Sequence, residues 1–236
     1  MIISHRHKFI FIKTKKTAGT SLEIALSEFC GPEDVMTPLD PEDHLILRER
    51  GFPGPQNYRV PLRRYHARDW ARLLIRRIPA LPFINHQPAT HIRKYVRRSV
   101  WQTYFKFCVE RNPWDKALSA WHFTHHTKYP TVRDYVMSEK LRTLSDWHRY
   151  AEDDRVLVDH VIRYETLALE VAQIAERLGL PGVPQLPRAK GGFRKDRRPH
   201  WEVLGPEERD RVAEVFAREI AHFGFRFQPE EPVPAS

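Results

Sequence analysis

Phe9-Ile-Phe-Ile-Lys-Thr-Lys-Lys-Thr-Ala-Gly-Thr-Ser21 joins an apolar strand to a tight turn and the start of a helix. The helix continues through Leu22-Glu-Ile-Ala-Leu-Ser27. The first turn of a helix has backbone N–H groups without intrahelical partners, and it carries the positive end of the helix dipole. This strand–turn–helix unit therefore predicts a binding site for a phosphate or a sulfate.

The composition of the turn supports this interpretation. Lys13, Lys15 and Lys16 add positive charge, and Gly19 lets the backbone come close to a bulky oxyanion. Further hydrogen-bond donors are the hydroxyl groups of Thr17, Thr20 and Ser21. The motif G-x-x-x-x-G-K-[ST] is absent, because its lysine follows the second glycine whereas Lys16 precedes Gly19, so a nucleotide triphosphatase is disfavoured. The alternative is an ordinary turn with solvated lysines.

Length and composition restrict the class of protein. The chain has 236 residues, enough for one domain with a full core. Its formal charge of +9 favours a polyanionic partner but does not choose among a nucleotide, an acidic glycan, a nucleic acid and an anionic lipid. Cys30 and Cys108 show no metal-binding spacing. No stretch resembles a signal peptide or a membrane span, so we expect a cytoplasmic protein.

Strands and helices alternate along the chain. After the first strand and helix, we expect strands at 103–110 and 156–164 and helices at 42–50, 66–77, 88–97, 131–138, 141–150, 165–178 and 206–223, with a further helix starting at Asn112-Pro113. This order predicts an α/β fold with a parallel sheet, and ligands bind at the carboxyl ends of such strands. We expect a single domain over 1–228, with a variable segment at 31–83 and a frayed tail at 229–236.

A second group of polar residues follows the strand at 103–110. Arg111 ends this strand, and Ser119 lies about two turns into the next helix. A guanidinium group can bind a phosphate through two hydrogen bonds, and a serine hydroxyl can add another. Alternatively, Arg111 pairs with Glu110 or another nearby carboxylate, and Ser119 is a small packing residue.

Two stretches together resemble the two cofactor motifs of the PAPS-dependent sulfotransferases. They are Lys16-Thr-Ala-Gly-Thr-Ser21 and Val109-Glu-Arg-Asn-Pro-Trp-Asp-Lys-Ala-Leu-Ser119. The likeness is greatest to the carbohydrate-type (family 2) branch and its bacterial relatives. It continues through Asp159-His-Val-Ile-Arg-Tyr-Glu165 and Phe223-Gly-Phe225, whereas we recognise no such likeness in 31–83. The resemblance implies a P-loop-like three-layer α/β sandwich, with a central parallel sheet flanked by helices.

The resemblance also implies the cofactor and the residues that bind it. The sulfuryl donor is PAPS (3′-phosphoadenosine 5′-phosphosulfate), the product is PAP, and no metal is needed. Lys16 matches the catalytic lysine, and Arg111 and Ser119 match the ligands of the 3′-phosphate. The phosphosulfate loop corresponds to Thr17, Ala18, Gly19, Thr20 and Ser21. The late loop at 188–194 resembles a segment that covers the nucleotide, through Lys190, Gly191 and, more weakly, Arg194.

Sulfuryl transfer to a hydroxyl group needs a base, and histidine suits this task near neutral pH. His86, in Phe83-Ile-Asn-His-Gln-Pro-Ala89, lies where members of the branch carry a histidine base, and His91 is the second candidate. Either could instead be a loop histidine with local hydrogen bonds. His122, His125 and His126 share helical spacing, but without nearby carboxylates they indicate a surface or pocket face rather than a metal site.

The expected reaction is in-line displacement onto an acceptor hydroxyl, with a glycan as the first choice and a lipid or small metabolite as alternatives. The segment at 31–83 is expected to shape the acceptor site. A small-molecule kinase using ATP·Mg is the main enzymatic alternative, but no convincing Asp for Mg²⁺ follows an apolar strand. A non-enzymatic nucleic-acid-binding domain would not explain the spacing of Arg111 and Ser119. The sequence does not indicate the oligomeric state.

Overall fold

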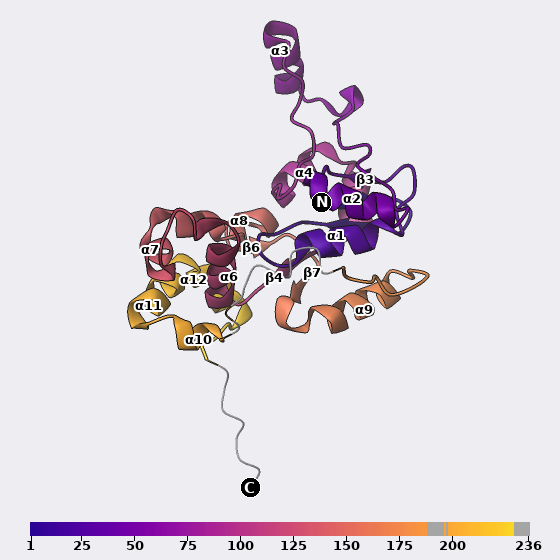
Figure 1. The fold of residues 1–236 in the computed structure, drawn as a ribbon. Coiled ribbons are helices and arrows are strands. Elements are labelled where there is room, and N and C mark those ends of the chain that lie inside the picture. Colours follow the sequence, from indigo (N-terminus) through magenta and orange to yellow (C-terminus); the bar gives the residue numbers. More distant parts are fainter. Residues whose placement is uncertain (188–195, 197, 229–236) are drawn as a thin grey trace. The chain divides into compact units, whose positions relative to one another are not determined.

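The computed structural model describes residues 1–187, 196 and 198–228. The chain divides into two compact units, and each is coloured along the sequence in Figure 1. The first unit consists of Met1–Glu110 and His148–Ala189, and it contains the main sheet. The second consists of Arg111–Trp147 and Lys190–Ser236, and its described part is built from helices.

The main sheet of the first unit has five strands in the order β3-β1-β2-β4-β7. Their bounds are Ile2–Ser4 (β1), Phe9–Phe11 (β2), Val35–Met36 (β3), Phe105–Glu110 (β4) and His160–Arg163 (β7). Strands β2, β4 and β7 are parallel, whereas β1 runs antiparallel to both β2 and β3. The α/β fold and the parallel strands are therefore confirmed. The antiparallel edge was not predicted, because strands of two or three residues leave too short a pattern to recognise.

Helices and short elements complete the first unit. They are α1 (Gly19–Ser27), α2 (Pro41–Glu49), α3 (Ala67–Arg76), α4 (Ala89–Tyr95), α5 (Arg98–Thr103), α9 (Leu167–Arg177), the 3₁₀ turns Leu62–Arg64 and Tyr164–Thr166, and the hairpin of β5 (Ala151–Glu152) and β6 (Arg155–Val156). The helices expected at 42–50, 66–77 and 88–97 are confirmed, the first shifted by one residue and the other two slightly shorter than expected. The strand expected at 156–164 is wrong at its start, because Val156 pairs with Ala151 in the hairpin.

Both faces of the main sheet are buried, as expected for parallel strands covered by helices. Phe9, Phe11 and Phe107 share one apolar cluster with residues of α1 and α9. Residues that point to the opposite face, such as Ile10 and Cys108, are also buried. Cys108 is thus a small core residue, as predicted, and both cysteines of the chain are free thiols.

The second unit is a helical cluster. It contains α6 (Pro113–Ala120), the π-helix Trp121–His125, α7 (Val132–Met137), the 3₁₀ helix Glu139–Leu144, α10 (His200–Val203), α11 (Pro206–Val215) and α12 (Ala217–Phe223), and α8 (Trp147–Tyr150) begins at its boundary. The predicted start of α6 is confirmed, because Asn112 Oδ1 accepts a hydrogen bond of 3.1 Å from the N–H of Trp114.

Two helix predictions in the second half of the chain were wrong in length. The helix expected at 141–150 is a 3₁₀ helix followed by α8. The helix expected at 206–223 is divided into α11 and α12, because Phe216 departs from helical geometry with φ −107° and ψ 25°. Phe216 is fully buried in the apolar cluster of this unit, so tertiary packing accounts for the break.

Within the described ranges, no helix has the length and apolarity that crossing a bilayer requires.

Candidate active site

The loop between β2 and α1 lies over the carboxyl end of β4. The N–H of Ile12 donates to the carbonyl oxygen of Phe107 at 2.9 Å, and Thr14 Oγ1 donates to the carbonyl oxygen of Val109 at 2.5 Å. These bonds continue the parallel pairing of the two strands into the loop. The predicted strand–turn–helix unit is confirmed at the end of the sheet where ligands bind in such folds.

Thr17 holds the loop in place from inside. Its side chain is fully buried, and its Oγ1 lies 2.8 Å from Thr14 Oγ1 and 3.3 Å from the Thr14 carbonyl oxygen. The hydroxyl proton of Thr14 is already donated to Val109, so the proton of Thr17 must point back to Thr14. The sequence had suggested the Thr17 hydroxyl as a donor to the ligand. In this structure the Thr17 hydroxyl is engaged by Thr14, and its role as a donor to the ligand stays a prediction.

The backbone of the loop has the geometry of an anion site. Lys16 and Ala18 have positive φ angles of 58° and 56°. They alternate along the chain with Thr17 and Gly19, whose φ angles are not positive. Such alternation can turn successive N–H groups toward a common point, as in the nests that bind anions. Helix α1 then begins with no side-chain cap and no acidic residue in its first turn. The positive end of its dipole is therefore not neutralised locally.

Gly19 also takes part in close packing within the loop, which the sequence did not predict. Its φ is not positive, but a Cβ atom at this position would lie 2.8 Å from Lys13 Cγ and 3.3 Å from the Thr14 carbonyl oxygen. The glycine therefore lets the start of α1 pack closely against the preceding part of the loop. The strained backbone positions fall on Lys16 and Ala18, where a sequence pattern gives no signal.

Lys13 does not contribute its charge to the loop surface. Its side chain is buried, and its Nζ lies 2.9 Å from Glu23 Oε2. Burial alone would raise the pKa of Glu23, but the Met1 ammonium group and Lys13 lower that pKa below its usual value. The expectation that Lys13 adds charge to the site was therefore wrong. Lys15 and Lys16 are half-buried and remain the candidates for that role.

His86 lies beside the loop. Its Nδ1 is 3.2 Å from the carbonyl oxygen of Lys13, and Arg149 donates to the carbonyl oxygen of His86 itself. A carbonyl can only accept, so the proton of the neutral imidazole is on Nδ1 and its lone pair is on Nε2. The residue has φ 59°, an uncommon conformation that is frequent at functional sites. The structure thus brings together the loop and the histidine that the sequence favoured.

His91, the second candidate for the base, packs in an aromatic cluster. Its ring centroid lies 4.8 Å from that of Tyr95 and 6.3 Å from that of Phe83. Its Nε2 is buried without a hydrogen-bond partner. Burial, together with the charge of Lys94, lowers the pKa of His91. The ring of His91, a half-buried residue of α4, is thus held in packing contacts.

In the second unit, Arg111 precedes α6 and is held by Asp115. The Nε and Nη2 atoms of Arg111 lie 2.7 and 2.6 Å from Asp115 Oδ2. Ser119 is half-buried one helical turn after Asp115, so these two residues lie on the same face of α6, and Arg111 precedes the helix. The alternative pairing with a nearby carboxylate is therefore present. A guanidinium group has five N–H donors, so pairing with one carboxylate does not by itself exclude binding to a phosphate.

The other predicted site residues give less information. Lys190, Gly191 and Arg194, like the tail at 229–236, lie outside the described residues. His126 is exposed and His122 stacks against Trp121, whereas the side chain of His125 also lies outside what is described. No group of three or more potential metal ligands occurs in the part of the chain that the structure describes. The absence of a metal from the reaction stays a prediction.

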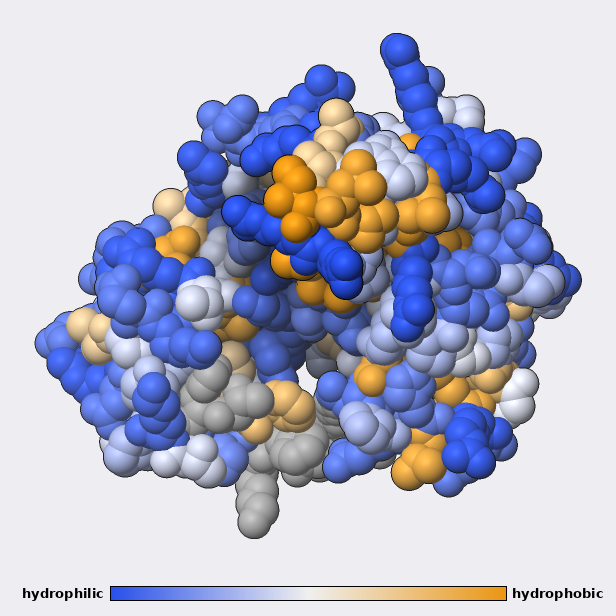
Figure 2. All heavy atoms as spheres, turned by 90° about the horizontal axis from the view of Figure 1, so that it is seen from above, coloured by the Kyte–Doolittle hydropathy of each residue, from blue (hydrophilic) through white to orange (hydrophobic). Residues whose placement is uncertain are grey.

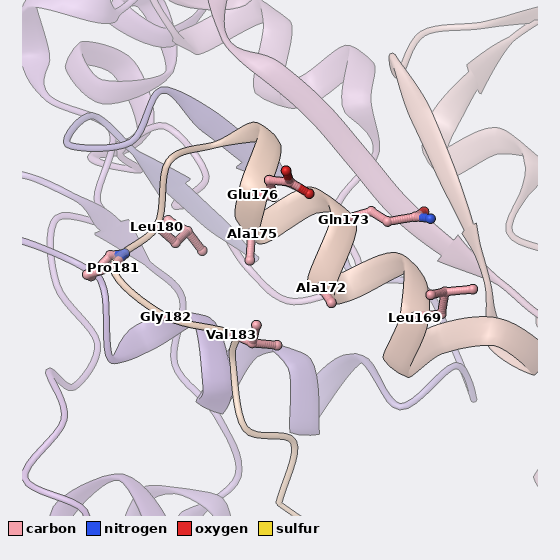
Figure 3. Close-up of a pocket in the computed structure, with 9 residues that line it drawn as sticks. All are labelled: Leu169, Ala172, Gln173, Ala175, Glu176, Leu180, Pro181, Gly182 and Val183. Carbon is pink, nitrogen blue, oxygen red and sulfur yellow. The ribbon is translucent and has the colours of Figure 1, made fainter.

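A pocket of about 380 Å³ lies between α9 and the segment after it (Figure 3). Its lining is mostly apolar, with Leu169, Leu180 and Val183 among the contacts, and Glu176 is its one charged residue. A carboxylate and apolar walls do not suit a polyanionic nucleotide. The pocket contains none of the residues that the sequence assigned to the cofactor.

Comparison with known proteins identifies the family. An uncharacterized protein of Archaeoglobus fulgidus is 29% identical over 102 residues, which cover 40% of this chain and 83% of that protein. Residues 1–226 match the sequence pattern of the Sulfotransferase family, a range within which the loop, His86, Arg111 and Ser119 all fall. The chain belongs to the Sulfotransferase family, and it is a PAPS-dependent transferase.

Proposed function

We propose that this sulfotransferase transfers the sulfuryl group of PAPS to a glycan hydroxyl by in-line displacement, with His86 as the general base. The likeness of both cofactor motifs to the carbohydrate-type branch supports a glycan acceptor. The segment at 31–83 is proposed to shape the acceptor site within a single catalytic domain over 1–228. PAPS supplies the sulfuryl group and a phosphate leaving group.

The loop is proposed to bind the phosphosulfate. The alternating φ angles of Lys16 and Ala18 and the uncapped start of α1 support this role. The donors are proposed to be the Lys16 ammonium group and the backbone N–H groups of residues 17–21, together with the Thr20 and Ser21 hydroxyls. Fixed donors accelerate the reaction most where negative charge develops, which is on the leaving oxygen.

The observation that carries the assignment of the base is the contact between His86 Nδ1 and the Lys13 carbonyl oxygen. It fixes the tautomer with the lone pair on Nε2, and it ties the ring to the loop that is proposed to bind the donor. A base held beside the reacting group removes the acceptor proton as the new bond forms. Arg149 supports the strained backbone of His86 and is proposed as a positioning residue.

Arg111 and Ser119 are proposed to bind the 3′-phosphate. The contact with Asp115 fixes the guanidinium orientation before the nucleotide binds, which lowers the entropy cost of binding. Lys190 and Gly191 are proposed to cover the nucleotide, on the strength of the resemblance alone. No residue in this scheme requires a metal ion.

The substitution His86→Asn tests the base most sharply. The Asn side-chain amide can keep a hydrogen bond to the Lys13 carbonyl oxygen, but it has no basic nitrogen. We expect kcat to fall about 10²–10⁴-fold, while the Kd for PAP changes by less than about threefold. Transfer from labelled PAPS to a panel of glycans and calorimetry with PAP measure the two quantities.

His91→Asn is the matched control, because it removes the second candidate base. Its kcat should remain near the wild-type value in the folded protein, as monitored by circular dichroism. If His86→Asn keeps wild-type kcat, or if His91→Asn loses activity while still binding PAP, the assignment of His86 is wrong. Transfer to lipids or small metabolites, with none to glycans, would reject the glycan acceptor.

A further inference from the structure

Helix α3 has clearly separated polar and apolar sides. The helical period places one set of residues on the apolar side: Ala67, Trp70, Ala71, Leu74 and Ile75. The opposite side carries Arg68, Asp69, Arg72 and Arg76. A surface helix normally turns its apolar side toward the core.

Here the apolar side faces away from the protein. Asp69 is only 3% exposed, and it accepts hydrogen bonds from the Tyr95 hydroxyl at 2.9 Å and from the backbone N–H of His66 at 3.0 Å. Leu74 and Ile75, in contrast, are 76% and 80% exposed. The helix therefore docks through its polar side, and its most apolar side chains contact solvent.

The exposed apolar surface extends beyond the helix. Large hydrophobic residues that are also exposed flank α3 on both sides: Leu62, Ile78, Leu81 and Ile84. Figure 2, which looks onto the molecule from the α3 side of Figure 1, shows an apolar patch bordered by hydrophilic side chains. Contiguous apolar patches of this kind mark surfaces that bind a partner or a membrane.

The border of this patch is strongly basic. The segment at 62–84 contains six arginines and one acidic residue, the buried Asp69. The six are Arg63, Arg64, Arg68, Arg72, Arg76 and Arg77. Within the described residues, none of these six guanidinium groups forms an ion pair. Their charges are therefore available to anions outside the chain.

We propose that the segment at 62–84 is a membrane-docking element that inserts the apolar side of α3 into an anionic bilayer surface. Helices that lie in the membrane interface combine this composition of Leu, Ile and Trp on one side with arginine on the other. The arginines would meet lipid phosphates, while Leu74 and Ile75 would enter the acyl-chain boundary. A nucleic acid would pair with the arginines but would leave the apolar side exposed to water.

Sedimentation with lipid vesicles tests the proposal. The wild-type chain should bind vesicles of phosphatidylcholine mixed with phosphatidylglycerol at least about tenfold more tightly than vesicles of phosphatidylcholine alone, and added salt should weaken the binding. The double variant Leu74→Glu, Ile75→Glu should bind the mixed vesicles at least about tenfold more weakly, because both side chains leave the acyl region. Both residues are exposed, so the fold should be retained.

Leu45→Glu on α2 is the matched control, because Leu45 is exposed outside this segment and should not affect vesicle binding. Failure of the wild type to bind mixed vesicles would overturn the proposal, as would equal binding by the double variant. A dimer in analytical ultracentrifugation that the double variant dissociates, without vesicle binding, would instead assign the patch to a second copy of the chain. None of these measurements depends on sulfotransferase activity.

Discussion

Substitution of Gly19 by alanine probes whether the loop geometry controls nucleotide binding. The added Cβ would lie 2.8 Å from Lys13 Cγ, and Cβ atoms in proteins essentially never come this close to another atom. Lys13 cannot move aside freely, because its side chain is buried and its Nζ pairs with Glu23 at 2.9 Å. The other close atom, the Thr14 carbonyl oxygen at 3.3 Å, is part of the backbone. The start of α1 must therefore shift relative to the loop.

Two opposing contributions determine how much Gly19→Ala changes the free energy of unfolding. Overpacking at a buried site costs about 1–3 kcal/mol, and replacing glycine by alanine in a helix regains about 0.4–1 kcal/mol. The expected net loss of stability is about 1–2 kcal/mol, which lowers Tm by about 2–8 °C in a chain of this size. The N–H groups at the start of α1 move with the helix, so the Kd for PAP should rise about tenfold or more.

Thermal unfolding and calorimetry with PAP measure these two effects. Gly54→Ala is the matched control, because a Cβ at Gly54 meets no atom within 4 Å and its φ is not positive. This control should change neither Tm nor the Kd for PAP beyond experimental error. If Gly19→Ala binds PAP with wild-type affinity and unfolds at the wild-type Tm, the close packing does not set the loop geometry, and the reasoning is refuted.

Three further predictions address other parts of the chain. Lys16→Ala should lower kcat by about 10²-fold or more in a labelled PAPS assay, because a donor to the leaving oxygen is lost; near-normal turnover would remove Lys16 from the mechanism. Arg111→Ala should weaken PAP binding about 10–100-fold in calorimetry but leave AMP binding unchanged, because AMP lacks the 3′-phosphate; equal losses for both nucleotides would contradict the assigned role. Burial alone would raise the pKa of Asp69, but hydrogen bonds from His66 and Tyr95 lower it overall. The stabilising effect of the ionised Asp69 is therefore complete at neutral pH and is lost progressively as the pH falls below 3.8, so Asp69→Asn should reduce Tm most at neutral pH and by less and less as the pH is lowered below 3.8. A constant Tm difference across that range would exclude the predicted linkage.

The main architecture could be predicted because its signals are local. The apolar run before Lys13, the turn and the helix after Gly19 each have a clear sequence pattern, and Asn112-Pro113 marks the start of α6. The alternation of these elements was enough to predict parallel strands. The short antiparallel strands and the break at Phe216 depend on pairing or packing between distant segments, which a local pattern does not contain.

The candidate site was predictable in its residue types but not in their partners. The sequence marks Lys13 and Thr17 as polar loop residues, yet only the fold shows that Glu23 and Thr14 engage them. The positive φ angles at Lys16 and Ala18 also have no signal in the sequence, because neither residue is a glycine. The contact of His86 with the loop joins segments more than 70 residues apart, so only resemblance to a family could suggest it.

A crystal structure of the chain with PAP is the most direct test of the proposed donor site. The account predicts the 5′-phosphate within hydrogen-bond distance of the N–H groups of residues 17–21, with Arg111 on the 3′-phosphate. A 5′-phosphate bound away from this loop, for example in the pocket beside α9, would contradict the account.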